Sequence, residues 1–433
     1  MRLVRAFVVL AHLAVAVFAL AGCGLNPSGN GTGTTLRVAN LIPGSTSVTV
    51  TVGGTAFMSG SPFETITSYA DIPAGAYVFN VNLAGATTPA FSITSTLFNV
   101  SAYSFVTYGQ STAVGGLLLA DTLLQNVPTG NFALRVANVS PTAGAVDAYL
   151  TAPGADLTGV SPIVAGIVYQ SNSAFINVPQ GSYQLRLTRT GTKEVIFDAP
   201  APAFADGSGQ TVVAYSRGSA RLVNVVLLTS AGASTIINNQ LAQLKAVNAS
   251  SVVSPLNVFV DGMLTIANIP YTGASNYQRV AAGARTITVE AAATPGATLL
   301  TTTPTLKAAT DTSIALYGAA GSLGALVLTD ANVSTLTGRA QVRFVNVSPG
   351  LPAFDVYANQ TLTASGVLQN SASTYALLDG TPEGTPYQFD FNPAGAGDPV
   401  LTLTAVPLTQ GSIYTIYVMG PATALQAIVV QDF

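Results

Sequence analysis

The stretch LRVANVSPTAGAVDAYL, Leu134–Leu150, decides the fold, because versions of it recur along the chain. It opens with a short apolar strand that ends in Asn. This opening appears at Leu36–Asn40, Leu134–Asn138, Leu244–Asn248 and Val342–Asn346, as LRVAN, LRVAN, LKAVN and VRFVN. The steps between the Asn residues are 98, 110 and 98. Self-similarity at a nearly fixed spacing predicts repeated structural units, here four similar modules.

A hairpin signal lies at the same distance behind the Asn in three modules. Thirteen residues after it come Gly53, Asp261 and Asn359, between apolar runs. Gly-Gly and Asp-Gly are typical of two-residue hairpins, since both central residues of a type I′ turn need positive φ. The second module departs, because its strand runs into the insertion Thr151–Gly159. That insertion accounts for most of the longer step.

Aromatic residues recur further along each module. Tyr69, Phe175 and Tyr277 precede a Gly by six residues, and the interval from Tyr375 to Gly384 is longer. A strand then begins with Tyr77, Tyr183, Arg285 or Tyr387. Tyrosine at that place favours a tyrosine corner, with a buried ring and a hydroxyl bonded to the backbone. A stacking platform for sugars is the alternative.

The strands alternate in polarity. In YQLRLT the side chains of Tyr183, Leu185 and Leu187 share one face and polar side chains share the other, which is typical of a half-buried antiparallel strand. About seven strands in roughly 100 residues predict an all-β fold of tandem immunoglobulin-like antiparallel β-sandwiches. A small closed barrel is the alternative. The chain has no Trp and one Cys, so no Cys–Trp–Cys core supports the prediction.

The N-terminus indicates export. Arg2 and Arg5 precede the apolar run Ala6–Leu20, as in a secretory signal peptide, and a membrane helix is the alternative. The following Leu20-Ala21-Gly22-Cys23 resembles the lipobox of bacterial lipoproteins, which implies that Cys23 is diacylated and becomes the mature N-terminus. Gly24 in place of Asp resembles the pattern for the outer membrane, with the periplasmic or the surface-exposed leaflet left open.

These signals divide the chain. The predicted segments are a signal peptide at 1–22, a flexible Gly/Ser/Thr-rich tether at 23–35, and β-sandwich modules 1 to 4 at 36–130, 131–239, 240–338 and 339–433. The junction Val127–Gly130 is only a few residues long, so neighbouring modules should touch. Charged residues make up 8% of the chain, which raises the chance that apolar faces pack against another module or molecule.

The composition restricts the chemistry. His12 leaves with the signal peptide and Cys23 is consumed by lipid, so a Ser-His-Asp triad, a Cys-His pair and a zinc site of the usual ligands are excluded. Loss of Arg2 and Arg5 takes the net charge from −3 to −5, and no basic run indicates nucleic acid. We therefore expect no metal and no cofactor, with calcium between modules as the weaker alternative.

Acidic residues give no catalytic pattern. Glu64, Glu194, Glu290 and Glu383 fall at unrelated points of the repeats, and none has an acidic neighbour. Glycoside hydrolysis needs two carboxylates in one cleft. We therefore expect no catalytic residues and no enzyme.

Two polar positions recur. Asp147 and Asp355 follow their Asn by nine residues, where module 1 has Thr49 and module 3 has Asn257. This exchange favours a local hydrogen bond over a ligand contact. A basic residue also stands three positions before each Asn: Arg37, Arg135, Lys245 and Arg343. Strand alternation predicts that it faces solvent or spans toward the preceding module, and a ladder of anion contacts is the alternative.

The openings of modules 2 and 4 resemble a known family. LRVANVSPTAGAVDAYL and VRFVNVSPGLPAFDVYAN (Val342–Asn359) are similar to the bacterial domain of unknown function 4397, which opens with a strand, Asn or His, Ser-Pro, a short turn and V-D-V-Y. The matching residues are Asn138, Ser140, Pro141, Asp147 and Tyr149, and Asn346, Ser348, Pro349, Asp355 and Tyr357. Modules 1 and 3 match less well. The resemblance implies four copies in a secreted or lipid-anchored surface protein, with no established activity.

Together these observations predict a lipid-anchored, non-catalytic structural or interaction protein of the cell envelope. It would contact a membrane through its acyl chains, and a protein or glycan at the cell surface. A surface lipoprotein that binds carbohydrate or another small ligand is the alternative, and a carboxylate-based hydrolase is the third choice.

Overall fold

A computed structural model describes residues 33–110, 113–122, 127–319, 321–333 and 338–432. The predicted signal peptide, Cys23 and most of the tether lie outside these ranges. Gly33–Thr35, assigned from the sequence to the tether, belong instead to the first strand, β1. The described residues form strands, turns and irregular segments without helix, and none of them makes up an apolar helix of membrane-spanning length.

Module 1 is a sandwich of two sheets. Its pairing sheet, named for the contact described below, has the order β4-β1-β8-β9, and β5 also pairs with β1. Its outer sheet has the order β3-β2-β6-β7. The strands are β1 (Gly33–Asn40), β2 (Val48–Val52), β3 (Thr55–Ser61), β4 (Thr65–Ile66), β5 (Ala70–Pro73), β6 (Gly75–Leu83), β7 (Phe91–Leu97), β8 (Ala102–Gln110) and β9 (Ala113–Ala120).

Modules 2, 3 and 4 repeat this topology. In module 2 the pairing sheet holds β10 (Asn131–Asn138), β13 (Ser171–Asn172), β14 (Ile176–Pro179), β17 (Gly209–Tyr215), β18 (Asn224–Thr229) and β19 (Ser234–Ile237), and the outer sheet holds β11 (Val146–Thr151), β12 (Val164–Ile167), β15 (Gln184–Arg189) and β16 (Val195–Pro200).

In module 3 the pairing sheet holds β20 (Leu241–Asn248), β23 (Gln278–Ala281), β28 (Asp311–Tyr317) and β29 (Gly324–Asp330). The outer sheet holds β21 (Leu256–Val260), β22 (Met263–Ile269), β25 (Ile287–Ala291) and β26 (Thr298–Thr302), and β24 (Gly283–Ala284) pairs with β27 (Thr305–Leu306).

In module 4 the pairing sheet holds β30 (Arg339–Asn346), β33 (Ser371–Ala372), β34 (Ala376–Asp379), β37 (Ile413–Met419) and β38 (Gln426–Gln431). The outer sheet holds β31 (Ala353–Ala358), β32 (Thr361–Leu368), β35 (Thr385–Pro393) and β36 (Leu401–Leu408).

The predicted all-β sandwich architecture is confirmed. One detail of the strand order goes beyond the prediction. The Asn-ending strand of each module is central in its sheet and runs parallel to one later strand: β1 to β8, β10 to β17, β20 to β28 and β30 to β37. The other strand pairs of the sandwiches are antiparallel. This order differs from the ABED/CFG arrangement of immunoglobulin constant domains.

The predicted hairpin turns are present between the first two strands of three outer sheets. Both central residues have positive φ at Gly53-Gly54 (57° and 85°), Asp261-Gly262 (50° and 79°) and Asn359-Gln360 (44° and 69°). That geometry matches the right-handed twist of the flanking strands, which is why the turn residues recur. Alternation then places Val48, Val50 and Val52 in the core.

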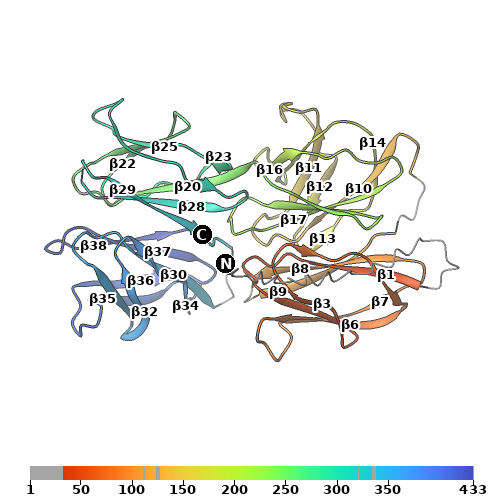
Figure 1. Ribbon diagram of the computed structural model, residues 1–433, viewed down its shortest axis with the longest axis horizontal. Helices are drawn as coiled ribbons and strands as arrows, with labels where there is room; N and C mark the ends of the chain where they lie inside the picture. The colour runs from red at the N-terminus through yellow and green to blue at the C-terminus, as the bar shows by residue number, and fades with distance from the viewer. Residues whose placement is uncertain (1–32, 111–112, 123–126, 320, 334–337, 433) are drawn as a thin grey trace, which may run out of the picture.

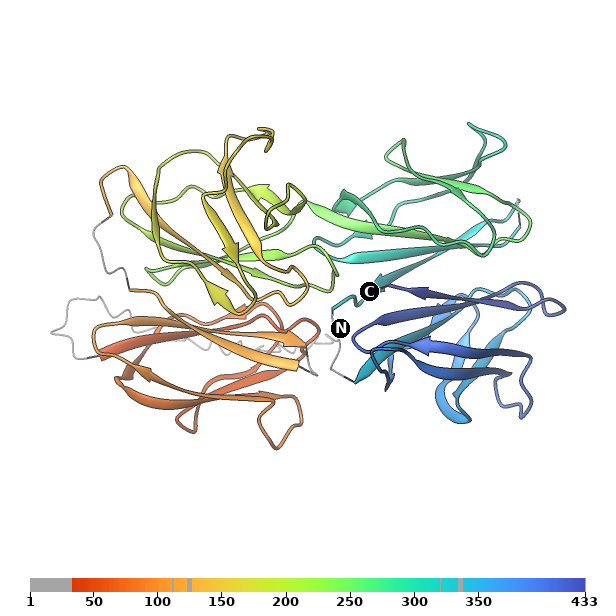
Figure 2. The ribbon, with the colours of Figure 1, turned by 180° about the vertical axis from the view of Figure 1, so that it is seen from behind.

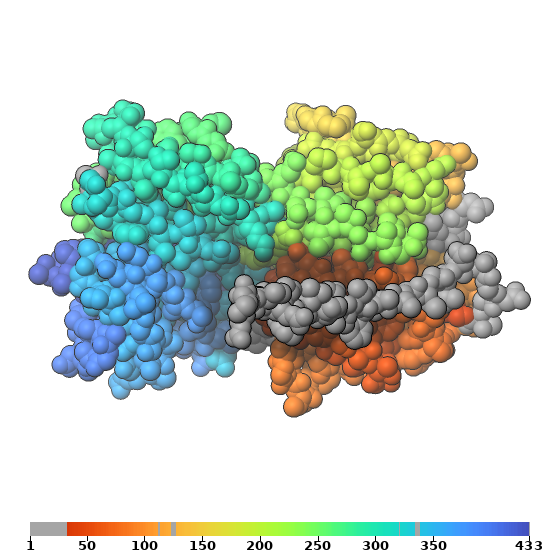
Figure 3. All heavy atoms as spheres, in the orientation of Figure 1, coloured from red at the N-terminus to blue at the C-terminus, as the bar shows by residue number. Residues whose placement is uncertain are grey.

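The four sandwiches lie two by two (Figure 1). Module 1 packs its pairing sheet on that of module 2, and module 3 packs on module 4; the view from behind shows the same arrangement (Figure 2). Each contact has its own buried apolar cluster: Ala39, Leu41, Val106, Tyr108, Leu119, Ala137, Val139, Val213, Tyr215, Val226 and Leu228 in the first pair, and Val247, Ala249, Ala315, Val345, Val347, Tyr417 and Met419 in the second. In the space-filling view the modules of each pair lie in close contact (Figure 3).

Candidate functional site

The recurring Asn closes the loop after the first strand of each module. Asn346 Nδ2 donates to the carbonyls of Leu351 (2.8 Å) and Val367 (3.2 Å), and its Oδ1 accepts from the Ser348 amide. Asn138 and Asn248 make matching bonds, and Asn40 does so with the Ser45 hydroxyl in place of one of the carbonyls. All four side chains are fully buried. Because a buried carbonyl without a donor is costly, the residue stabilises the loop, and its side-chain groups are all used within the module.

Asp147 and Asp355 are also satisfied locally. Asp355 accepts hydrogen bonds from Ser365 Oγ and from the Gly366 and Gly395 amides. Asp147 accepts from the Gly166 and Gly191 amides and from Thr190. The backbone amides hold the pKa of Asp355 below its usual value. Thr49 and Asn257 accept an amide in the same way, so the expected local hydrogen bond is confirmed.

The predicted tyrosine corners are present in part. Tyr77 and Tyr183 donate from their hydroxyls to the carbonyls of Pro73 and Pro179, and the Tyr387 hydroxyl accepts from the Asp379 amide. The ring of Tyr387 is buried, whereas those of Tyr77 and Tyr183 are only half-buried against their cores. Their hydroxyls are thus tied to backbone rather than presented to a sugar.

The recurring basic residue meets the recurring aromatic residue. Each cation lies over a ring, with centroid distances of 4.5 to 4.9 Å: Arg37 over Tyr69, Arg135 over Phe175, Lys245 over Tyr277 and Arg343 over Tyr375. All four basic side chains are buried, at 0–4% exposure. The expectation that they face solvent is therefore wrong. The other half of that prediction, a contact with the preceding module, is right for Arg135 and Arg343.

In the first pair an acidic residue at the end of β9 serves both modules. Asp121 accepts from Arg135 Nη2 of module 2 at 2.6 Å and lies 3.5 Å from Arg37 Nη2 of its own module. Ser104 and Tyr69 also donate to it. Burial lowers the pKa of Arg135, and the charge of Asp121 acts against that shift. The cation is therefore held by an anion that is equally buried.

In the second pair the exchange of charges is reciprocal. Arg343 of module 4 donates to Asp330 of module 3 (2.5 Å), and Lys245 of module 3 pairs with Asp432 of module 4. Asp330 also accepts from Ser313 and Tyr277, and Asp432 accepts from Thr415 at 2.5 Å. The two modules thus use the same positions on both sides, as in an isologous dimer interface.

Module 2 breaks this pattern at one position. The strand pairing aligns Ser230 with Asp121, Asp330 and Asp432 of the other modules, since each stands at the end of the strand that pairs with β17, β8, β28 or β37, in the same register. Arg37 therefore finds no carboxylate in module 2 and donates to the carbonyls of Thr229 (2.9 Å) and Ala233 (3.1 Å). At these positions the first pair therefore has two cations and one anion, whereas the second pair has two of each.

A further ion pair joins modules 1 and 2 at their rim. Arg217 binds Glu64 with two hydrogen bonds, from Nε at 2.5 Å and from Nη2 at 2.8 Å. The Tyr215 hydroxyl donates to the same carboxylate. Burial raises the pKa of Glu64, but the bonds from Arg217 and Tyr215 outweigh it and leave the value lowered. Glu64 is thus part of the interface between modules 1 and 2.

The two pairs are joined through Asp311 at the start of β28. This side chain accepts from Ser219 Oγ (2.6 Å) and the Ala220 amide (3.0 Å) of module 2, and from Asn332 (2.9 Å). It is completely buried, and no cation is among these partners. Burial raises the pKa of Asp311 to about 6.

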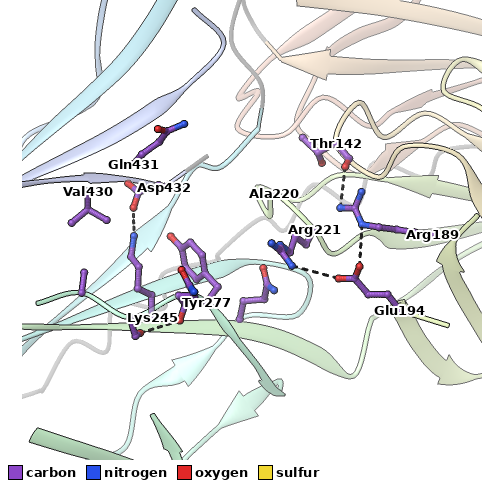
Figure 4. Close-up of a pocket in the computed structure, with 14 residues that line it drawn as sticks. Thr142, Arg189, Glu194, Ala220, Arg221, Lys245, Tyr277, Val430, Gln431 and Asp432 are labelled. Carbon is purple, nitrogen blue, oxygen red and sulfur yellow. Dashed lines mark hydrogen bonds and ion pairs between the residues drawn. The ribbon is translucent and has the colours of Figure 1, made fainter. Parts of the chain in front are cut away.

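A polar cavity of about 750 Å³ lies where modules 2, 3 and 4 meet. On one side are Arg189, Glu194 and Arg221 of module 2, and on the other are Lys245, Tyr277 and Asp432 (Figure 4). Glu194 lies 3.6 Å from both arginines, so their ion pairs are loose. Among the described residues, no three His, Cys, Asp or Glu side chains gather in a way that could hold a metal ion.

Sequence reasoning missed the acidic partners of the basic residues. Asp121, Asp330 and Asp432 do recur, but they stand at the end of the last strand of their modules, which has no shared motif. Only the strand register aligns them. The low charge content was the available signal that faces of the modules are covered, and the two apolar clusters between modules confirm that inference.

Known proteins offer limited comparison. No curated protein matches the chain. Among solved structures, the crystal structure of CBMbc (family CBM26) from Eubacterium rectale Amy13K in complex with maltoheptaose is 9% identical and has a TM-score of 0.15, covering 43% of this chain and 96% of that one. The Bacillus anthracis TIE protein is 10% identical with a TM-score of 0.15, covering 90% and 69%. Likenesses this weak carry no argument about function.

The family comparison is more informative. The model of the family described as "Domain of unknown function (DUF4397)" matches residues 34–149, 242–357 and 340–433. These matches contain modules 1, 3 and 4, and the first extends into β10 and β11 of module 2. Module 2 is not matched as a separate copy. The chain therefore belongs to the DUF4397 family, as a tandem array of its β-rich domains.

Proposed function

We propose that this protein is a non-catalytic structural or interaction protein of the cell envelope, anchored by lipid at Cys23. Module 2 would be a fourth, diverged copy of the family domain, since its strand order is that of the other three. The lipobox-like Leu20–Cys23 supports the anchor. The tether that follows would separate the modules from the membrane.

One observation carries the structural role. The polar residues that recur in the modules have internal partners: Asn closes a loop, Asp147 and Asp355 hold backbone amides, and the basic residues join neighbouring modules. These residues therefore recur because each module needs them to fold and to pack against its neighbours in one block of four modules. Because the pairs are held by buried charges and apolar clusters, the block would move as one body on its tether.

The anchor can be tested in cells with Cys23→Ser as the unanchored control. We expect the wild-type protein to take up a labelled fatty acid and to fractionate with membranes, and we expect the variant to do neither. Crosslinking in living cells, followed by purification of the protein, then shows whether a partner is attached to it. A defined envelope partner that is lost with the variant supports an interaction role. A wild-type protein that stays soluble and unlabelled contradicts the proposal.

The cavity favours a second candidate, the binding of a carbohydrate or another small polar ligand. Its volume of about 750 Å³ falls in the range of small-molecule sites, and polar side chains from three modules converge on it. A glycan array probed with the full chain tests this candidate. Binding that Arg221→Ala weakens, and that Arg279→Ala leaves unchanged, would support it. An array without signal would reject glycans as the ligand.

A further inference from the structure

The contact between Lys245 and Asp432 differs from the other charge pairs between modules. Arginine supplies the cation in modules 1, 2 and 4, and lysine supplies it only in module 3. An arginine guanidinium stays protonated in proteins, whereas a buried lysine readily loses its proton and becomes a nucleophilic amine. Module 3 therefore places an amine, which can act as a nucleophile, where the other modules place a guanidinium.

The surroundings shield both groups from water. The Lys245 side chain is 3% exposed and that of Asp432 is fully buried. Burial raises the pKa of Asp432, and the negative charge of Asp330 adds to the shift. The ring of Tyr277 covers the amine, with its centroid 4.6 Å from Nζ. Taking two opposite charges out of water is costly, so a reaction that removes both charges is favoured here.

The pair is also positioned for reaction. Lys245 Nζ contacts Asp432 Oδ1 directly. The other carboxylate oxygen, Oδ2, accepts the Thr415 hydroxyl at 2.5 Å. A donor on that oxygen would stabilise negative charge as it develops during attack on the carbon between them. Two groups held in contact by a folded protein react far faster than the same groups in solution.

We propose that Lys245 and Asp432 condense into an amide bond between Nζ and Cγ, which ties module 3 covalently to module 4. A proton passes from Nζ to Oδ1, and the neutral amine attacks Cγ. The C–Oδ1 bond then breaks, and Oδ1 leaves as water with two of the three ammonium hydrogens. The third hydrogen stays on the amide nitrogen, and Oδ2 becomes the amide carbonyl oxygen. No oxidant or co-reactant is needed.

The adjoining cavity gives the water a way out. Lys245, Tyr277 and Asp432 form part of its wall, and Figure 4 shows the pair at its edge. The new bond would close a loop between residues 187 positions apart. A chain whose only Cys is the predicted lipid site has no internal disulfide, so such a link would be its covalent staple.

Mass spectrometry of the purified full chain tests the proposal. We expect the wild-type protein to be lighter by one water molecule than the mass calculated for the same processed chain, and tryptic digestion to yield one branched peptide that joins the segments around Lys245 and Asp432. Trypsin should fail to cut after Lys245. On a denaturing gel the linked chain should migrate faster than an unlinked one, because its unfolded form is more compact.

Two variants borrow residues that the sister modules have at the same positions. Lys245→Arg keeps the cation, as in modules 1, 2 and 4, and Asp432→Ser copies Ser230 of module 2. Both should have the full mass of their sequences and the slower mobility. If the folded wild-type chain has its full mass and cleaves normally after Lys245, the pair is an ion pair only and the proposal is wrong.

Discussion

Arg135 of module 2 and Asp121 of module 1 form a buried ion pair, with Nη2 and Oδ1 2.6 Å apart and both side chains at most 4% exposed. The contact joins the start of one module to the end of the module before it. Arg343 and Asp330 repeat it in the second pair, at 2.5 Å. The same basic and acidic positions thus join the two modules in both pairs, and the contribution of each ion pair to stability can be tested separately.

Removing the shared anion should strongly destabilise the first pair. Asp121→Asn leaves Arg135 and Arg37 buried without a carboxylate, and losing one partner of a buried ion pair costs about 3–5 kcal/mol. Urea unfolding measures the change. Asp379→Asn is the matched control, because Asp379 pairs with Arg339 at the surface, where about 0–1 kcal/mol is expected. Equal effects of the two substitutions would contradict a dominant role for the buried network.

Supplying the missing anion should have the opposite effect. Ser230→Asp places a carboxylate where modules 1, 3 and 4 have one, beside the Arg37 guanidinium. We expect a gain of about 1 kcal/mol in the free energy of unfolding, since a hydrogen bond to a charged group is worth about 1.5–3 kcal/mol and desolvation takes part of it. Ser230→Asn controls for size. A loss of stability with Asp and not with Asn would show that the position rejects an anion.

Asp311 should make stability depend on pH. Its pKa in the folded protein is about 6, above the ordinary value of 3.8, so its contribution is fully present below about pH 4 and is lost as the pH rises through 6. The shift corresponds to at most about 3 kcal/mol. Chemical unfolding of wild type and Asp311→Asn at pH 4.5 and pH 7.5 isolates this contribution. We expect the wild type to lose stability relative to the variant at the higher pH, and parallel changes would contradict the assignment.

The recurring Asn should be costly to remove. Asn346→Ala leaves the carbonyls of Leu351 and Val367 and the Ser348 amide without their partner. We expect a loss of about 2–3 kcal/mol, because each unsatisfied buried group costs about 1–3 kcal/mol and the loop relaxes in part. Thermal unfolding measures it. Asn99→Ala, at an exposed position, should change stability by less than about 0.5 kcal/mol.

The features that could be predicted from the sequence are those that depend on residues close together in the chain, such as turns and local hydrogen bonds. The turns at Gly53 and Asp261 need residues that adopt positive φ, and this prediction is confirmed. The position of Asp355, which is Thr49 in module 1 and Asn257 in module 3, needs only a side chain that accepts a nearby amide, and this prediction is confirmed as well. Strand alternation gave the core face correctly. The prediction that Arg37 faces solvent was wrong. Alternation shows which side chains lie on the face away from the core, but it does not show whether that face contacts water or a neighbouring module.

The cavity and the acidic partners were beyond sequence reasoning for another reason. Asp432 meets Lys245 only because module 4 folds back onto module 3, so that residues 187 positions apart come together. The amino-acid sequence contains no signal that module 4 folds back, since a straight array of modules and a folded one have the same strands and turns. The low charge content predicted that some faces of the modules are covered. It did not predict which module covers which face.

The pairing of the modules has a consequence for how such chains evolve. Each pairing sheet carries buried apolar residues and a buried cation that need a partner sheet. Gene duplication of one module would leave such a sheet exposed to water and prone to aggregate, whereas duplication of a pair leaves none. Duplication of a pair would therefore keep every pairing sheet covered, and we expect chains of this kind to have an even number of modules, or an odd number with the last sheet completed by a second molecule.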